Sequence, residues 1–178
     1  MKIGFTGTMS VGKTTLVNAL KNLPQFEGYT FTTERSAYLS SLGIPLNYET
    51  TIEGQTIFLA ERVSELMNPN LITDRTILDV IAFTNRAQKV SIMDRDAFAE
   101  YACRFIKQYD YIFYISPKGM DIEDNGVRET DTNYRAEIDE EIQKLILKYN
   151  PPYYELKGST EERIGQIMKV IEPQYVLS

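Results

Sequence analysis

The chain contains no histidine among its 178 residues, and it contains a single cysteine, Cys103. The absence of histidine excludes Ser-His and Cys-His catalysis and most zinc sites, because each of these needs an imidazole. One cysteine cannot form an internal disulfide, which is typical of proteins in a reducing compartment. The residues around Cys103 follow a half-apolar helical pattern, so we interpret it as a packing residue rather than a nucleophile.

Long apolar segments and an excess of positive charge are also missing. No apolar run approaches the length that crosses a membrane, and the chain enters an expected strand at its second residue, so we expect neither a membrane span nor a signal peptide. The net charge of −6 and the isoelectric point of about 4.8 argue against a protein that coats a nucleic-acid backbone. A local basic pocket for a small anion remains compatible with this charge. We therefore expect a cytoplasmic protein without a membrane partner.

Short apolar runs alternate with amphipathic stretches, with no internal repeat and no flexible linker, and the length fits one domain. Strands are expected at residues 2–6, 29–33, 71–73, 111–116 and 153–156. Helical spacing is found at residues 12–22, 52–67, 76–88, 94–107, 132–149 and 160–171, the last preceded by a capping-box pattern at Ser159 and Glu162. The alternation predicts a single three-layer α/β domain with helices on both faces of a five-stranded parallel sheet.

The stretch GTMSVGKT, from Gly7 to Thr14, lies between the first expected strand and the first expected helix. This context distinguishes a true phosphate-binding loop from a chance match. The backbone N–H groups of such a loop bind a β-phosphate, and the helix adds its positive dipole end. Lys13 would bridge the β- and γ-phosphates, and the Thr14 hydroxyl would ligate Mg²⁺. The residues expected to contact the nucleotide are Gly7, Thr8, Met9, Ser10, Val11, Gly12, Lys13, Thr14 and Thr15.

Charged residues follow the second and third expected strands, at the edge where doubly wound sheets bind ligands. Glu34 would accept the proton of an attacking hydroxyl. Asp74 would hold Mg²⁺ or its water shell, and the forked donors of Arg75 would bind phosphate. The alternative for both sites is a solvated ion pair, Glu34 with Arg35 and Asp74 with Arg75. We interpret Asp79, one helical turn further on, as a helix-surface residue.

The segment of residues 118–136 is a candidate lid over the site. Arg128 lies in its flexible part, where it would stabilise transition-state charge on lid closure. Arg135 lies three residues before Ile138 on the apolar stripe of the next helix, so it points inward and would contact phosphate. The alternative for Arg135 is an ion pair with Asp139, four residues later.

The helix expected at residues 52–67 is a candidate wall of an acceptor pocket. Helical spacing places Gln55, Phe58 and Arg62 on one face, directed toward the body of the protein. A glutamine amide can read the edge of a base, and an aromatic ring can stack on it. Ordinary core packing with two polar residues at its edge is an equally good interpretation.

The motifs that accompany the loop separate the classes of phosphate-loop protein. GTPases need a guanine-reading Asn-Lys-x-Asp and a switch Asp-x-x-Gly, and neither occurs here. AAA-type motors usually need a larger body and a helical lid domain, for which 178 residues leave little room. Small kinases fit the length, and they carry acids and arginines where Glu34, Asp74, Arg75 and Arg128 stand.

The order of the motifs resembles the AAA-like P-loop kinase domains that include bacterial ribosylnicotinamide kinases and, more distantly, the deoxynucleoside kinases. The matching stretches, which span nearly the whole chain, are KIGFTGTMSVGKTTLVNAL, TTERSAYL, LITDRTILDVIAF, DNGVRETDTNYRAEIDEEI and YYELKGSTEERI. The resemblance implies ATP- and Mg²⁺-dependent phosphorylation of a hydroxyl on a nucleoside-like molecule. It matches Glu34 to the base, Asp74 and Arg75 to the acid-arginine pair of the third strand, and Arg128 and Arg135 to lid arginines.

Three functions are compatible with the sequence. The favoured one is a kinase that transfers the γ-phosphate of ATP to a hydroxyl of a small nucleoside-like acceptor. The second is a nucleotide kinase or a kinase of a DNA hydroxyl, including a modified base, although the acidic charge weighs against long DNA. The third is a nucleotide-binding switch that hydrolyses slowly. Glu34 and the lid arginines favour transfer, because a switch needs no acceptor base.

Overall fold

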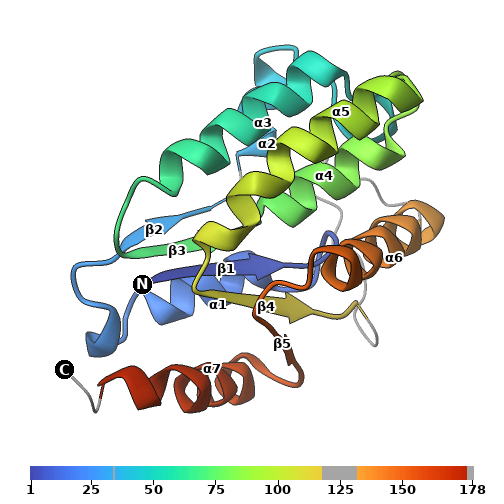
Figure 1. Ribbon diagram of the computed structural model, residues 1–178. Helices are drawn as coiled ribbons and strands as arrows, with labels where there is room; N and C mark the ends of the chain where they lie inside the picture. Colours follow the sequence, from blue (N-terminus) through green and yellow to red (C-terminus); the bar gives the residue numbers. More distant parts are fainter. Residues whose placement is uncertain (34, 118–131, 176–178) are drawn as a thin grey trace.

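Five parallel strands form a single sheet at the centre of the protein (Figure 1). The computed structural model describes residues 1–33, 35–117 and 132–175. From edge to edge the strands are β2 (Thr30–Thr32), β3 (Leu71–Asp74), β1 (Lys2–Thr6), β4 (Tyr111–Ile115) and β5 (Tyr153–Leu156). The α/β fold with a five-stranded parallel sheet is confirmed, and β1 and β5 have the bounds expected from the sequence.

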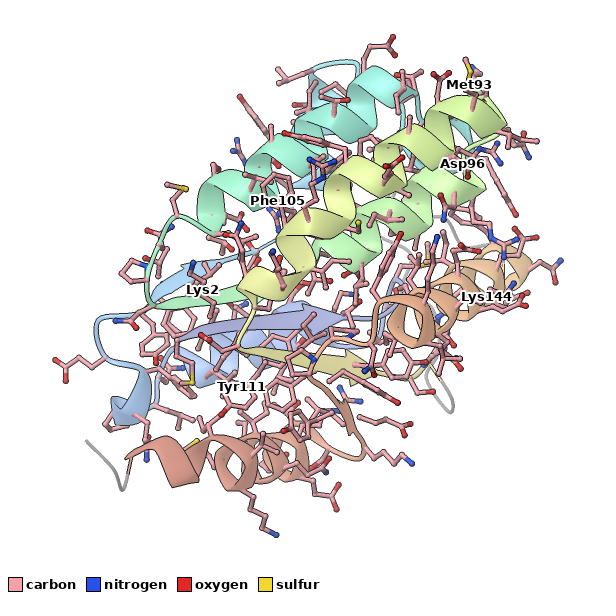
Figure 2. All side chains as sticks on the ribbon, in the orientation of Figure 1. Lys2, Met93, Asp96, Phe105, Tyr111 and Lys144 are labelled. Atoms are coloured by element: carbon pink, nitrogen blue, oxygen red, sulfur yellow. The ribbon has the colours of Figure 1, made fainter. Side chains whose placement is uncertain are left out.

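Helices cover both faces of this sheet and give the expected three layers (Figure 1). Successive side chains of a strand point to opposite faces, so Phe113 of β4 joins one apolar core and Tyr114 joins the other. The core around Phe113 is covered by α1 (Lys13–Leu20) and α7 (Thr160–Tyr175). The core around Tyr114 is covered by α3 (Ile52–Glu65), α4 (Ile77–Arg86), α5 (Ile92–Ala102) and α6 (Thr132–Tyr149). Charged side chains such as Lys144 line the outer surface (Figure 2).

Side-chain caps fix where two of these helices begin. Ser91 Oγ accepts a hydrogen bond from the backbone N–H of Asp94 at 3.1 Å, which starts α5 two residues earlier than the apolar spacing indicates. Before α7, the backbone N–H of Glu162 donates to Ser159 Oγ at 3.3 Å, and the N–H of Ser159 donates to Glu162 Oε2 at 2.7 Å. The expected capping box is confirmed.

The connections contain short elements that the sequence pattern did not indicate. They are α2 (Ser36–Ser41) and the single-turn or short 3₁₀ helices η1 (Pro24–Phe26), η2 (Asn47–Glu49) and η3 (Cys103–Gln108). The stretch expected as one helix at 94–107 is therefore α5 followed by η3, and β2 is one residue shorter at each end than expected. Within the described ranges, no helix combines the length and the apolar character that crossing a bilayer requires.

A close approach between β1 and the start of α4 brings distant parts of the chain to the same edge of the sheet. A Cβ at Gly4 would lie 2.5 Å from the Thr76 methyl group and 2.9 Å from the Tyr109 ring, so only glycine fits there. Tyr109 is buried, and this burial raises the pKa of its hydroxyl. The contact places the first turn of α4 beside the loop that follows β1.

Candidate active site

The loop from Gly7 to Gly12 joins β1 to α1 at the carboxyl end of the central strand. Gly7 has φ of +145°, and a Cβ there would lie 2.5 Å from the carbonyl oxygen of Ile115, at the end of β4. Gly12 has φ of +82°, a left-handed conformation that favours glycine. Both glycines of the motif are therefore required by backbone geometry, as a phosphate-binding loop demands.

Lys13 is the first residue of α1, and its side chain folds back across the loop. Its Nζ donates to the carbonyl oxygens of Gly7 and Thr8, each at 2.7 Å, and only 5% of the residue is exposed. The ammonium group therefore lies at the loop itself, where an incoming phosphate would meet it. The contact of Lys13 with the β- and γ-phosphates remains a prediction.

Thr14 and Asp74 come together at the ends of α1 and β3 as the sequence analysis anticipated for a Mg²⁺ site. The Thr14 hydroxyl donates a hydrogen bond to Asp74 Oδ2. Asp74 is 1% exposed, and its Oδ1 has no hydrogen-bond donor among the residues that the structure describes. This burial excludes a solvated ion pair for Asp74. A buried carboxylate oxygen beside a hydroxyl suits a hydrated Mg²⁺, which needs only one or two protein oxygens when it also binds phosphate.

Two arginines from different helices bind the outward-facing carbonyl groups of the loop. Arg135 of α6, 8% exposed, donates from Nε to the Met9 carbonyl and from Nη2 to the Ser10 carbonyl, both at 3.2 Å. Arg163 of α7 donates from Nη1 to the Val11 carbonyl at 2.9 Å. Arg135 faces inward as expected, but these bonds go to the loop backbone, so its phosphate contact remains a prediction.

Arg163 was not identified from the sequence. The signal that would have found it is its position four residues before Ile167, which places an arginine on the buried stripe of α7. It is 4% exposed, and burial lowers the pKa of its guanidinium.

The interpretation of Asp79 as a helix-surface residue is wrong, because its side chain is fully buried. Asp79 is the third residue of α4, and its Oδ2 accepts from the backbone N–H of Thr76 at 2.7 Å and from the Thr76 hydroxyl at 2.9 Å, completing a capping box. Its Oδ1 accepts from the N–H of Gly7 at 3.3 Å. The cap turns the carboxylate back toward the helix start, which lies beside the loop, so Asp79 connects α4 to the phosphate-binding motif.

Arg75, the residue after Asp74, has a left-handed backbone with φ of +85°. Such a conformation costs a non-glycine residue about 1–3 kcal/mol and is typical of functional sites. Its N–H donates to the carbonyl of Phe5 at 3.0 Å, and its guanidinium lies 4.7 Å from the centre of the Phe83 ring. The side chain is therefore directed toward α4, over an aromatic surface that can hold a cation. Its phosphate contact remains a prediction.

The polar residues expected on the inner face of α3 are buried there. Gln55 Nε2 donates to Thr50 Oγ1 at 2.9 Å. Arg62 Nη1 donates to the carbonyl of Asp74 at 3.1 Å, and Nη2 donates to Glu65 Oε1 at 2.6 Å. These contacts agree with the core-packing interpretation. Through the bond to the Asp74 carbonyl, Arg62 also holds the end of β3. Substrate contacts of Gln55, Arg62 and the half-buried Phe58 remain predictions.

Two predicted catalytic residues, Glu34 and Arg128, lie outside the described residues, as does most of the candidate lid. Thr32, at the end of β2, pairs with Thr73 of β3, so the two strands end at the same level of the sheet. The roles of Glu34 and Arg128 remain predictions.

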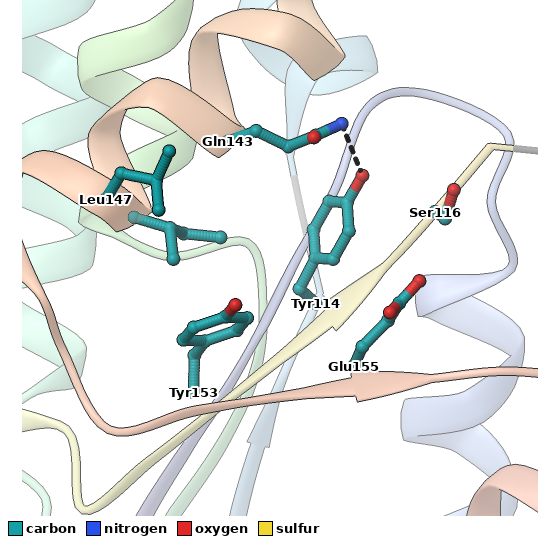
Figure 3. Close-up of a pocket in the computed structure, with 7 residues that line it drawn as sticks. Tyr114, Ser116, Gln143, Leu147, Tyr153 and Glu155 are labelled. Carbon is teal, nitrogen blue, oxygen red and sulfur yellow. Dashed lines mark hydrogen bonds between the residues drawn. The ribbon is translucent and has the colours of Figure 1, made fainter.

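A pocket of about 270 Å³ lies between α6 and the strands β4 and β5 (Figure 3). In its lining, Gln143 Nε2 donates to the Tyr114 hydroxyl at 3.1 Å. That hydroxyl donates in turn to Oδ1 of Asp139, a buried residue behind the lining, at 2.8 Å. The remaining lining residues are Ser116, Ile146, Leu147, Tyr153 and Glu155. Because Ser116 directly follows Ile115, the carbonyl of which touches Gly7, the pocket begins next to the loop. No pattern in the sequence indicated this pocket.

The chain was compared with models of known protein families. The family model described as an AAA domain matches residues 2–163. The chain belongs to the AAA domain family. A comparison with curated proteins gives no match.

This AAA domain has the fold of several solved kinase structures. Deoxyadenosine kinase from M. mycoides with bound dATP is 18% identical, with 97% of this chain and 100% of that chain covered and a TM-score of 0.64. Thymidylate kinase from Ehrlichia chaffeensis is 17% identical, with coverage of 96% and 98% and a TM-score of 0.65. The NadR protein in complex with NR is 18% identical, with 88% of this chain but 45% of that chain covered and a TM-score of 0.70. The resemblance to AAA-like P-loop kinases is confirmed at the level of family and fold.

Proposed function

We propose that this AAA domain is a kinase that transfers the γ-phosphate of ATP to a hydroxyl of a nucleoside-like acceptor in a Mg²⁺-dependent reaction. The observation that carries the proposal is the buried Asp74 carboxylate, with one oxygen bonded to Thr14 and the other lacking a donor among the described residues. A purely structural carboxylate would use both oxygens. Here the Asp74 oxygen that lacks a donor among the described residues lies beside the loop proposed to bind phosphate.

On the donor side, the N–H groups of the loop would bind the β-phosphate. Lys13 would exchange its bonds to two neutral carbonyls for bonds to negatively charged phosphate oxygens. Thr14 and Asp74 would hold Mg²⁺ directly or through its waters. The metal, when bound, would neutralise negative charge on the transferring phosphoryl group.

On the acceptor side, Glu34 would accept the proton of the hydroxyl as its oxygen bonds to the γ-phosphorus and the bond to the β–γ bridging oxygen breaks, releasing ADP. Arg75, held over Phe83, would contact the acceptor or the transferring phosphate. Arg128 and Arg135 would add positive charge that stabilises the transferring phosphoryl group. Arg62 would act indirectly, because it binds the carbonyl of Asp74.

The acceptor class is supported by the similar structures, which include kinases named for a deoxynucleoside and for thymidylate. The thymidylate kinase also supports the alternative of a nucleotide acceptor, which Arg75 could bind through its phosphate. The net charge of −6 favours a small acceptor over long DNA.

The test is to incubate the protein with Mg²⁺, ATP labelled at the γ-phosphate and separate panels of nucleosides, nucleotides and short oligonucleotides. We expect label to move to a member of the nucleoside panel. Transfer to a nucleotide or an oligonucleotide instead would replace the acceptor but keep the reaction. ATP hydrolysis that no acceptor alters would contradict the kinase and favour a nucleotide-binding switch.

A further inference from the structure

The carbonyl groups of the phosphate-binding loop need partners outside the loop. When the N–H groups of a loop converge on an anion, the carbonyl groups point away from it, and buried carbonyls must find donors. Here the carbonyls of Met9 and Ser10 accept from Arg135, and the carbonyl of Val11 accepts from Arg163. The loop is thus held from outside by guanidinium groups on two helices that pack on opposite faces of the sheet.

The peptide unit of Val11 lies between two residues of unusual backbone conformation. The residues on either side, Ser10 and Gly12, both have left-handed backbones, with φ of +57° and +82°. No regular hydrogen-bond ladder runs through this point, because α1 begins only at Lys13. The Val11 carbonyl accepts a hydrogen bond from Arg163, which lies 152 residues away in the chain.

Arg163 also lies against the next residue of the loop. A Cβ at Gly12 would lie 3.1 Å from Arg163 Nη1, so the guanidinium occupies the space beside Gly12. An arginine is rarely as buried as Arg163, at 4% exposure, unless it is paired, and here the Val11 carbonyl is a partner. Its charge sits behind the peptide units that would face the β-phosphate.

We propose that Arg163 is a positioning residue of the donor site, which orients the Val11–Gly12 backbone so that its N–H groups bind the β-phosphate. The inference rests on the donor half of the proposed function. It predicts that the loss of Arg163 weakens binding of any ligand with a β-phosphate, whether or not the ligand carries a base.

The test compares ADP and inorganic pyrophosphate by calorimetry in the presence of Mg²⁺. The variants are Arg163→Met, which removes the donor, and Arg163→Lys, which keeps the charge but ends one atom short of Nη1. Lys169→Met, which removes an exposed positive charge from the same helix, is the control. Thermal melting of each variant reports whether it folds.

We expect Arg163→Met to weaken the binding of ADP and of pyrophosphate by the same factor, about tenfold or more. This is the scale of one hydrogen bond from a charged group. Arg163→Lys should weaken both by a smaller factor, and Lys169→Met should bind both as the wild type does. A loss confined to ADP would overturn the inference, because Arg163 would then contact the base or sugar.

Unchanged affinities in a folded Arg163→Met variant would equally overturn it, and a lowered melting temperature alone would mean only a structural role. If Arg163→Met does not fold, wild-type affinity of Arg163→Lys for both ligands is the overturning result. If the wild-type protein binds neither ligand, the proposed function itself is contradicted. This result is distinct from a failure of the Arg163 inference, in which the wild type binds both ligands.

Discussion

The hydroxyl of Thr14 and the carboxylate of Asp74 are hydrogen-bonded across 60 residues of chain, joining the first helix to the end of the third strand. The contact is possible because β3 pairs with β1 in parallel register, with Phe5 opposite Asp74, so the loop after β1 and the end of β3 share one edge. The loop after β1 and Asp74 thereby form one site.

Replacing Asp74 by asparagine tests the metal role of this pair. An amide oxygen can still accept from Thr14, but a neutral side chain holds Mg²⁺ poorly, so we expect the variant to fold and to need much more Mg²⁺ for turnover. Titration of activity with Mg²⁺ measures the shift, and Asp96→Asn, an exposed acid on α5, is the control. An unchanged Mg²⁺ dependence would remove Asp74 from the metal site.

Lys13→Ala should fold and lose nearly all transfer. The lysine would supply charge to the migrating phosphoryl group, an effect worth several kcal/mol, or about 10²–10³-fold in rate, in a site with little water. Turnover measured at saturating ATP gives the loss, and Lys21→Ala, which removes an exposed lysine just after α1, serves as the matched control. Wild-type turnover in Lys13→Ala would contradict the phosphate-binding assignment.

Glu34→Gln should lower turnover by about 10²–10⁴-fold, the usual effect of removing a general base. ATP affinity should hardly change, because Glu34 is proposed on the acceptor side of the γ-phosphate. Turnover and calorimetric ATP binding are measured together, with Glu27→Gln as the control. If ATP binding collapses as well, Glu34 belongs to the metal site; if both values are normal, it is a surface acid.

Asp79→Asn should destabilise the fold, although it changes one atom. Asp79 accepts three hydrogen bonds through both oxygens, and an asparagine must turn its NH₂ group toward either Gly7 or Thr76, where it meets another donor. Leaving a buried donor unsatisfied costs about 1–3 kcal/mol. Urea titration gives the free energy of unfolding of each variant. The control is Asp94→Asn, in the exposed cap of α5, which should lose less stability. Equal stability of Asp79→Asn and wild type would refute the buried network.

Local patterns in the sequence were sufficient for the elements that carry their own signals. The bounds of β1 and β5, the loop from Gly7 to Thr14 and the capping box of Ser159 with Glu162 were all predicted, because strand alternation, glycine conformation and helix capping act over a few residues. The parallel sheet also followed from the alternation of strands and helices.

Helical spacing in the sequence determined the inward direction of some polar side chains, but only the tertiary structure decided what each one meets. Helical spacing placed Arg135 and Arg62 inside, yet their partners are the loop carbonyls and the end of β3. Local signals could have placed Asp79 and Arg163 inside, the first through its cap on Thr76 and the second through its spacing before Ile167. Their long-range partners Gly7 and Val11 lie 72 and 152 residues away, and no local pattern indicates them. A buried polar group takes whichever donor or acceptor the packing brings to it, and sequence spacing carries no information on contacts at that range.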